Sequence, residues 1–80
     1  MSSMKEIAIH TDYIKLGQLM KLAGWIQNGS DAKMYLAEGW VRLNGEIANQ
    51  RGKKVYPGDE VAVNLQGKME SVRVRAGGTP

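Results

Sequence analysis

Basic side chains are the functional groups that this sequence supplies most plainly for binding chemistry. Arg51, Lys53 and Lys54 stand together in the polar stretch 49–54, which has no apolar residue to anchor it. The chain has 11 Lys and Arg residues and 8 Asp and Glu residues. Residues 1–40 hold four basic and four acidic residues, so residues 41–80 hold seven basic and four acidic ones, a net charge of +3. Ammonium and guanidinium groups neutralise phosphates and release counterions. The distribution favours a nucleic-acid partner, whereas simple solubility is the alternative interpretation.

Catalytic chemistry finds little support in the same residues. The chain has no cysteine, and His10 is its one histidine, so thiolate nucleophiles, disulfides and the multi-histidine zinc sites of enzymes are excluded. Asp59 and Glu60 are adjacent carboxylates, but a Pro-Gly-Asp turn explains Asp59 without acid–base chemistry. No apolar stretch approaches the roughly 20 residues of a membrane span. We therefore predict a protein that is not an enzyme, has no cofactor or metal, and does not enter a membrane.

Two short helices are predicted in the first half of the chain. Apolar residues recur at helical spacing over 16–23, and Gly24 follows as a stop. A second helix is predicted over 31–38, with Ser30 as its N-cap and Gly39 as its C-terminal cap. Two helices joined by a glycine-containing turn form a helix-turn-helix-like pair.

Alternating apolar residues predict short strands around the helices and through the second half of the chain. Asn44-Gly45 predicts a two-residue hairpin turn, in which Arg42 would face Ile47 and Leu43 would face Glu46. The pattern predicts strands over 6–10, 40–43, 60–65 and 71–75, a type II turn over 56–59, a turn over 66–68 and a loop over 49–54. The pattern predicts one small α+β domain over 1–80, with loose termini at 1–5 and 76–80.

Four segments in this order resemble the S-four-type RNA-binding domain, which is named for the fourth protein of the small ribosomal subunit. The segments are 16–24, 28–33, 39–45 and 56–61, and the resemblance covers residues 13–64. It is strongest toward the small stand-alone bacterial versions, the YbcJ/YaaA-like proteins. The resemblance implies a helix pair packed on a small, bent, mainly antiparallel sheet, with the helices and adjacent loops facing structured RNA.

The resemblance also implies which residues contact RNA. A basic residue opens the first helix, and polar residues followed by a basic one lead into the second. Gly29 stands where the family often has arginine, which removes one expected phosphate contact. Further candidates lie on the hairpin strand and turn and on the loop that follows. The candidate RNA-binding residues are Lys15, Asn28, Ser30, Lys33, Arg42, Asn44, Arg51, Lys53 and Lys54.

The physical chemistry of the segment around Gly29 agrees with that implication. The start of a helix offers free N–H groups and a positive dipole end, which together bind phosphate. Glycine allows a ligand to approach the backbone closely there. We predict a cytoplasmic, monomeric RNA-binding protein that docks a preformed basic face on structured, ribosomal RNA through backbone phosphates.

The aromatic residues supply the main alternative. Trp40 joins a helix to a strand, so we expect it in the core or at its rim, and we expect partial burial for Tyr13 and Tyr56. Trp25 follows a helix stop and is expected to be half exposed. An exposed Trp25 patch would favour a protein-interaction adaptor that recruits an RNA-modifying or ribosome-associated partner. We expect Arg73 and Arg75 to lie on a strand that faces solvent.

Overall fold

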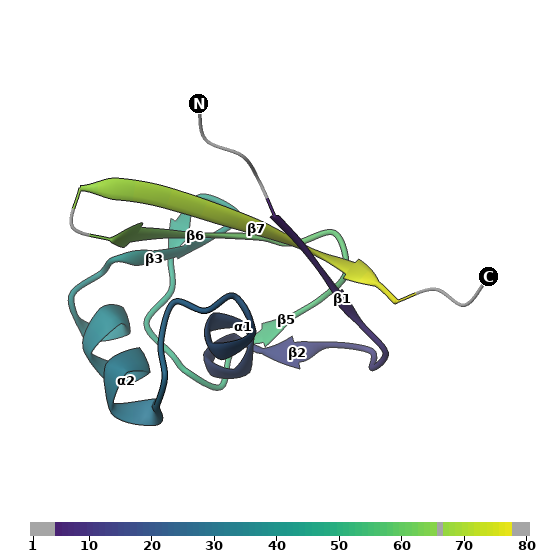
Figure 1. The fold of residues 1–80 in the computed structure, drawn as a ribbon, viewed down its shortest axis with the longest axis horizontal. Coiled ribbons are helices and arrows are strands. Elements are labelled where there is room, and N and C mark those ends of the chain that lie inside the picture. The colour runs from purple at the N-terminus through teal and green to yellow at the C-terminus, as the bar shows by residue number, and fades with distance from the viewer. Residues whose placement is uncertain (1–4, 66, 78–80) are drawn as a thin grey trace.

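Two helices lie against one face of a twisted sheet in the computed structural model of the protein, which describes residues 5–65 and 67–77 (Figure 1). The five-stranded sheet has the order β1-β7-β6-β3-β4, and β2 pairs with β5 in a separate ladder. Every ladder is antiparallel except the parallel pair β1–β7. The predicted α+β class and mainly antiparallel sheet are confirmed.

The elements are β1 (Lys5–Ile9), β2 (Ile14–Lys15), α1 (Leu16–Leu22), α2 (Gly29–Ala37), β3 (Val41–Leu43), β4 (Glu46–Ile47), β5 (Lys54–Val55), β6 (Glu60–Leu65) and β7 (Lys68–Ala76).

The long strand β7 organises the sheet because it pairs on both sides. Ile7 of β1 lies opposite Val74, and Val61 of β6 lies opposite Val72. The valines of β6 and β7 face the helices and are buried. Arg73 and Arg75, which alternate with the valines of β7, are exposed. This alternation is the one expected of a strand with one face on the core. Both strands are confirmed, although the second begins at residue 68 instead of 71.

The helices bury their apolar stripes under the sheet. In α1, Leu16, Leu19 and Met20 have no exposed surface. The helix ends before Gly24, and α2 ends before Gly39; both glycines have positive φ, +79° and +74°. Both predicted glycine stops are therefore confirmed.

The prediction of Ser30 as the N-cap of α2 is wrong. The helix begins two residues earlier, and Asn28 is its N-cap in extended backbone conformation. The Asn28 side-chain oxygen accepts a hydrogen bond from the Asp31 backbone N–H at 3.1 Å. Asparagine and serine are about equally good caps, so composition alone does not choose between them. Ser30 is instead an exposed residue of the first turn.

The Asn-Gly hairpin forms as predicted. Asn44 and Gly45 both have positive φ, 52° and 88°, which is the backbone of a type I′ turn. Arg42 lies opposite Ile47, and Leu43 lies opposite Glu46. The type II turn over 56–59 is confirmed as well: the Asp59 N–H donates to the Tyr56 carbonyl at 2.9 Å, and Gly58 has a φ of +97°.

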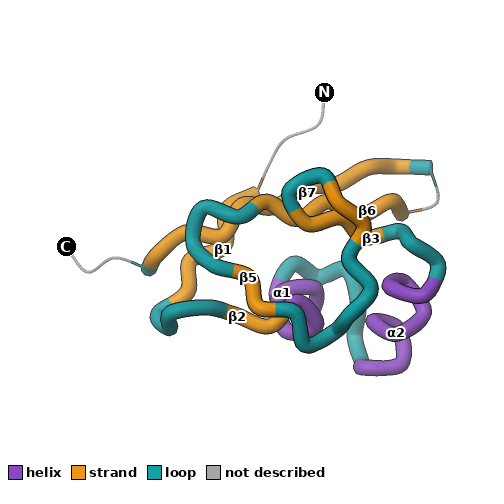
Figure 2. Tube along the Cα trace, turned by 180° about the vertical axis from the view of Figure 1, so that it is seen from behind, coloured by secondary structure: helices purple, strands orange, loops and turns teal. Residues whose placement is uncertain are grey.

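Part of the stretch predicted as a loop is a strand. Lys54 and Val55 form β5, in which Val55 is fully buried and pairs with Ile14 of β2. A ladder of two residues has no periodicity for a sequence pattern to detect. Figure 2 views the molecule from behind and shows the loop from β4 to β5 passing beside both helices.

The ends of the described chain are more ordered than expected. Lys5 begins β1 and Ala76 ends β7, where it pairs with Ile9. Gly77 also belongs to the expected loose C-terminus, and its N–H donates to the Ile9 carbonyl. Residues 1–4 and 78–80 of the expected loose termini lie outside the described residues, as does Gln66 of the predicted turn.

Trp25 is buried, not half exposed as predicted. Only 7% of its surface is accessible, and its indole N–H donates to a Glu70 carboxylate oxygen at 3.3 Å. The chain turns back after α1, where the Trp25 N–H bonds to the Met20 carbonyl, and this directs the ring toward the sheet. Trp40 is partly buried at the rim of the core and meets the Tyr35 ring edge-on, as expected for a residue between a helix and a strand.

We expect Gly45→Val to lower the free energy of unfolding by more than about 1 kcal/mol, because a β-branched residue resists positive φ. A side chain at Gly45 would meet open space, so the loss would report backbone strain alone. Gly52→Val is the matched control: it also faces open space but has no positive φ, and should change stability by less than about 0.5 kcal/mol. Urea denaturation measures both, and equal losses would contradict the turn assignment.

A second pair of variants tests the start of α2. Asn28→Ala removes the cap and should cost about 1 kcal/mol. Ser30→Ala should stay within about 0.5 kcal/mol, since its hydroxyl caps nothing. Thermal unfolding followed by circular dichroism measures both; a larger loss at Ser30 would restore serine as the cap.

Candidate nucleic-acid interface

The described ion pairs lie on the sheet. Arg73 pairs with Glu60, and Arg75 pairs with Glu6 at 3.9 Å. The hydrogen bond to Glu60 and the charge of that carboxylate raise the pKa of Arg73. These arginines are exposed on their strand as predicted, and their charge is already neutralised by neighbours.

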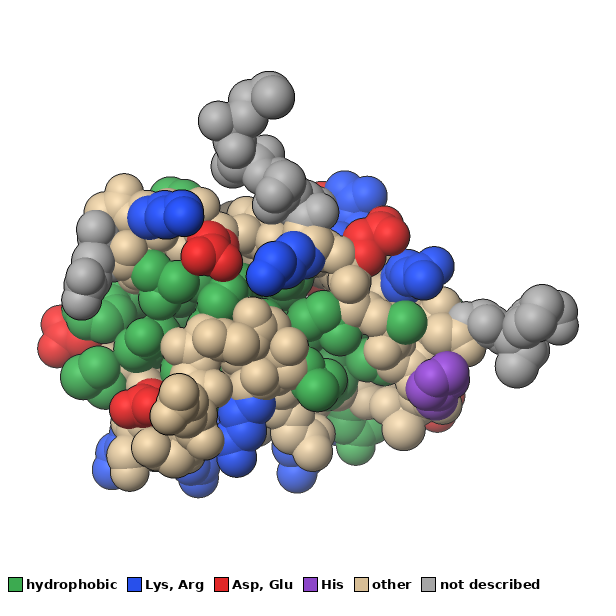
Figure 3. Space-filling model, viewed as in Figure 1, with side chains coloured by type: hydrophobic (Ala, Val, Ile, Leu, Met, Phe, Trp, Pro, Cys, Tyr) green, Lys and Arg blue, Asp and Glu red, His purple; other side chains and the backbone are tan. Residues whose placement is uncertain are grey.

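The basic residues near the helices have no such neighbours. Within residues 5–65 and 67–77, no acidic side chain lies within ion-pair distance of six of them: Lys15, Lys21, Lys33, Arg51, Lys53 and Lys54. All six are exposed. Figure 3 shows Lys and Arg side chains gathered below the helices, whereas the sheet edge above mixes basic and acidic side chains. The net positive charge is therefore available on the helical side of the molecule.

A cleft of about 440 Å³ lies among α1, the start of α2 and the turn at residues 51–52. We call it the basic cleft. Its lining comprises Lys15, Gly17, Gln18, Lys21, Gly29, Ala32, Arg51 and Gly52. Three of these residues are basic, and no acidic residue lines it. The cleft thus gathers positive charge in a concave surface between the two helices, and clefts lined by one sign of charge focus the electric field.

Arg51 crosses from one helix to the other. A Cβ at Gly17 would lie 2.5 Å from Arg51 Cγ, and a Cβ at Gly29 would lie 2.9 Å from Arg51 Nη1. The aliphatic stem therefore rests on α1, and the guanidinium lies at the first residue of α2. Gly29 stands where the family resemblance implied arginine, and here it makes room for a guanidinium supplied by residue 51.

Other predicted residues surround the cleft. Lys33 follows Gly29 by four residues, so it lies on the same side of α2. Lys54 has its ammonium nitrogen 4.9 Å from the centre of the Tyr13 ring, a cation–π contact on the β2–β5 side. Tyr13 is partly buried as expected, but Tyr56, whose ring centre is 5.8 Å away, is 47% exposed.

Of the nine predicted residues, Lys15 and Arg51 line the cleft, whereas Arg42 and Asn44 lie away from it. Arg42 lies between Val41 and Leu43 on β3, so it points to the opposite side of the strand. The Asn44 amide donates to an Asp59 carboxylate oxygen at 3.1 Å and accepts from the Glu60 N–H at 2.9 Å. Asn44 therefore ties the hairpin turn to the Pro-Gly-Asp turn.

Three residues that line the cleft were not among the predicted site residues: Gly17, Gln18 and Lys21. Lys21 follows Gly17 by one helical turn, and Gln18 follows Lys15 by three residues. These spacings place the polar residues of α1 on one face. A projection of the predicted helix would have grouped them; their partner, the turn at 51–52, is set by tertiary structure.

Two further observations concern the described part of the chain. No three His, Asp or Glu side chains there lie close enough together to hold a metal ion. Neither α1 nor α2 has the length and apolar character needed to cross a membrane.

The sequence matches the S4 domain family over residues 7–74. It is 46% identical over 66 residues to the "Probable ribosome maturation protein RlbA" of Bacillus subtilis (strain 168), covering 82% of this chain and 93% of that protein. It is 34% identical over 50 residues to YbcJ of Escherichia coli (strain K12), described provisionally as an RNA-binding protein, covering 62% and 71%. It is 36% identical over 73 residues to a tyrosine–tRNA ligase of Thiobacillus denitrificans, covering 89% of this chain but 18% of the ligase.

Proposed function

This chain belongs to the S4 domain family, and from that premise we propose that it binds structured RNA by docking its basic cleft on backbone phosphates. The observation that carries the proposal is the separation of charge. Arg73 and Arg75 on the sheet are paired with carboxylates, whereas six basic groups near the helices have no ion pair within the described residues, and three of them line one cleft. The names of two relatives, which refer to ribosome maturation and RNA binding, support ribosomal RNA as the partner. We propose that a single copy of the protein binds it in the cytoplasm.

Arg51 is the proposed central phosphate contact. Its stem is held against Gly17, and its backbone carbonyl accepts the Gly17 N–H at 2.9 Å. A side chain already held in place loses less conformational entropy when it binds. A planar guanidinium also matches two phosphate oxygens at once.

The start of α2 adds to the attraction. The positive end of the helix dipole and the first N–H groups lie beside the Arg51 guanidinium, which favours an anion between them. Asp31 in the first turn offsets part of this field. The exposed lysines at and near the cleft then add charges that attract the RNA backbone: Lys15, Lys21, Lys33 and Lys54.

Asn28 and Ser30 belong to this face by position, since both stand at the start of α2. Arg42 and Asn44 stand apart from the cleft, so we leave them out of the proposed phosphate contacts. Folded RNA is recognised largely through its shape and backbone, which a basic cleft between two helices can meet without a deep pocket.

The adaptor alternative loses its main support. It depended on an exposed Trp25 patch, and Trp25 is buried against the sheet with its N–H bonded to Glu70.

We expect the triple variant Lys15→Ala, Lys21→Ala, Arg51→Ala to lose most affinity for ribosomal RNA fragments. The plot of log affinity against log salt should flatten by about 2, because each lost phosphate contact on RNA removes roughly 0.7. Fluorescence anisotropy between about 50 and 200 mM salt measures both quantities.

The matched control removes three basic residues elsewhere: Lys5→Ala, Arg42→Ala, Lys68→Ala. These residues are exposed on the sheet and have no described ion pair. The control should keep most of the salt slope. Equal losses in both variants would show that net charge, not the cleft, governs binding.

A further inference from the structure

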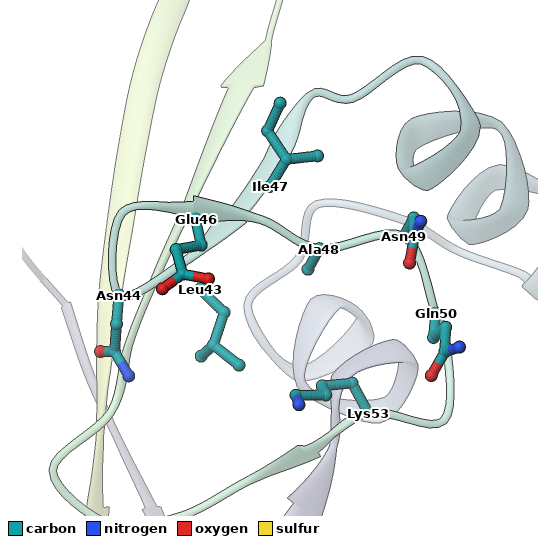
Figure 4. A pocket seen from close by; sticks show the side chains of 8 residues that line it. All are labelled: Leu43, Asn44, Glu46, Ile47, Ala48, Asn49, Gln50 and Lys53. Atoms are coloured by element: carbon teal, nitrogen blue, oxygen red, sulfur yellow. The ribbon is translucent and has the colours of Figure 1, made fainter.

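A second groove lies beside the basic cleft, between the β3–β4 hairpin and the segment that leads to β5 (Figure 4). It measures about 450 Å³, within the range of small-ligand sites. Its lining includes Leu43, Glu46, Ala48, Asn49, Gln50 and Lys53. In Figure 4, Leu43, Glu46 and Lys53 extend into the same space, whereas Ile47 points away from it. We call this site the hairpin groove.

The hairpin groove combines an apolar surface with polar groups that have no partner. Leu43 and Ala48 supply the apolar surface. Glu46 and Lys53 line the same groove, yet no ion pair joins them within the described residues. The Asn49 and Gln50 amides likewise form no side-chain hydrogen bond there.

These groups fit a nucleobase better than a phosphate. The Glu46 carboxylate offsets the charge of Lys53, so the groove attracts the RNA backbone less than the basic cleft next to it, whose lining has three basic residues and no acidic one. A flat heterocycle can instead lie on Leu43 and Ala48 while its edge meets the polar groups. RNA-binding proteins recognise unpaired bases in this way.

We propose that the hairpin groove binds the base of an unpaired guanosine, an inference that rests on the proposed RNA-binding function. The Watson–Crick edge of guanine presents one acceptor, O6, followed by two donors, N1–H and N2–H₂. Lys53 donates to the acceptor, and the two oxygens of the Glu46 carboxylate accept from the two donors. Such paired, charge-assisted hydrogen bonds are the strong ones.

The other bases do not offer this pattern. Adenine and cytosine each have one amino donor beside a ring-nitrogen acceptor, which a carboxylate repels. Uracil has a single N–H donor between two carbonyl acceptors. Guanine is therefore the base whose edge gives a carboxylate two adjacent donors.

The hairpin groove and the basic cleft share one short segment of chain. Arg51 lines the cleft and Lys53 lines the groove, with Gly52 between them. Their Cα atoms can be at most about 7 Å apart. One RNA strand can therefore place a phosphate at Arg51 and a neighbouring base at Lys53.

The test uses the full chain and synthetic RNA hairpins that share one stem and a uridine loop. One loop position carries guanosine, inosine, adenosine, cytidine or uridine, and anisotropy gives each affinity. We expect guanosine to bind about tenfold more tightly than adenosine, cytidine or uridine, the low end of one bidentate base contact. Inosine lacks the N2 amino group and should bind more weakly than guanosine.

The variant Glu46→Gln should abolish both the preference for guanosine and its advantage over inosine, because an amide presents one acceptor and one donor. Glu38→Gln removes the same charge from an exposed residue outside the groove and should keep both preferences. Equal binding of all five loops by the unmodified chain would overturn the guanine site, as would a preference that Glu46→Gln leaves intact.

The two proposals fail in different ways. Salt-dependent binding that is lost in the basic-cleft variant but shows no base preference contradicts the guanine site alone. Binding of no hairpin, or binding insensitive to salt and to the cleft variant, contradicts the proposed function and the guanine site with it.

Discussion

The arrangement of the basic residues depends on two backbone hydrogen bonds at the start of α1. The first N–H groups of a helix have no partner within the helix, and Lys15 offers no side-chain cap. The Lys53 carbonyl accepts the Leu16 N–H at 2.8 Å, and the Arg51 carbonyl accepts the Gly17 N–H at 2.9 Å. A segment remote in sequence thus completes the helix. Because its carbonyls satisfy α1, its side chains are placed beside both helices.

This docking explains why small residues stand on the facing helices. Only glycine at residue 17 leaves space for the Arg51 stem, and glycine at residue 29 admits its guanidinium. The same segment, with Val55 buried against Ile14, separates the basic cleft from the hairpin groove. Charge is divided by the fold: carboxylates neutralise Arg73 and Arg75 on the sheet, while the residues that surround α1 and α2 keep an unbalanced positive field.

Most of the fold could be predicted from the sequence because local chemistry sets it. Apolar spacing fixes the two helices, and Asn44-Gly45 sets both the turn and its register. The misses arose where distant residues decide. Trp25 is buried by the sheet, and β5 forms because the buried Val55 pairs with Ile14 of β2. The candidate site was predicted as residue types, and Arg51 was among them, but its contact with Gly17 and Gly29 is tertiary. Lys21 was missed although helical spacing groups it with Gly17.

We propose that RNA meets the protein at the basic cleft, where Gly17 and Gly29 face Arg51. Backbone amide spectra of the isotopically labelled protein, recorded during titration with a ribosomal RNA fragment, test it most directly. We expect the largest shifts at the amides of Gly17, Gly29 and Gly52, with little change along β1 and β7. Shifts concentrated on β1 and β7, with the cleft glycines unmoved, would contradict it.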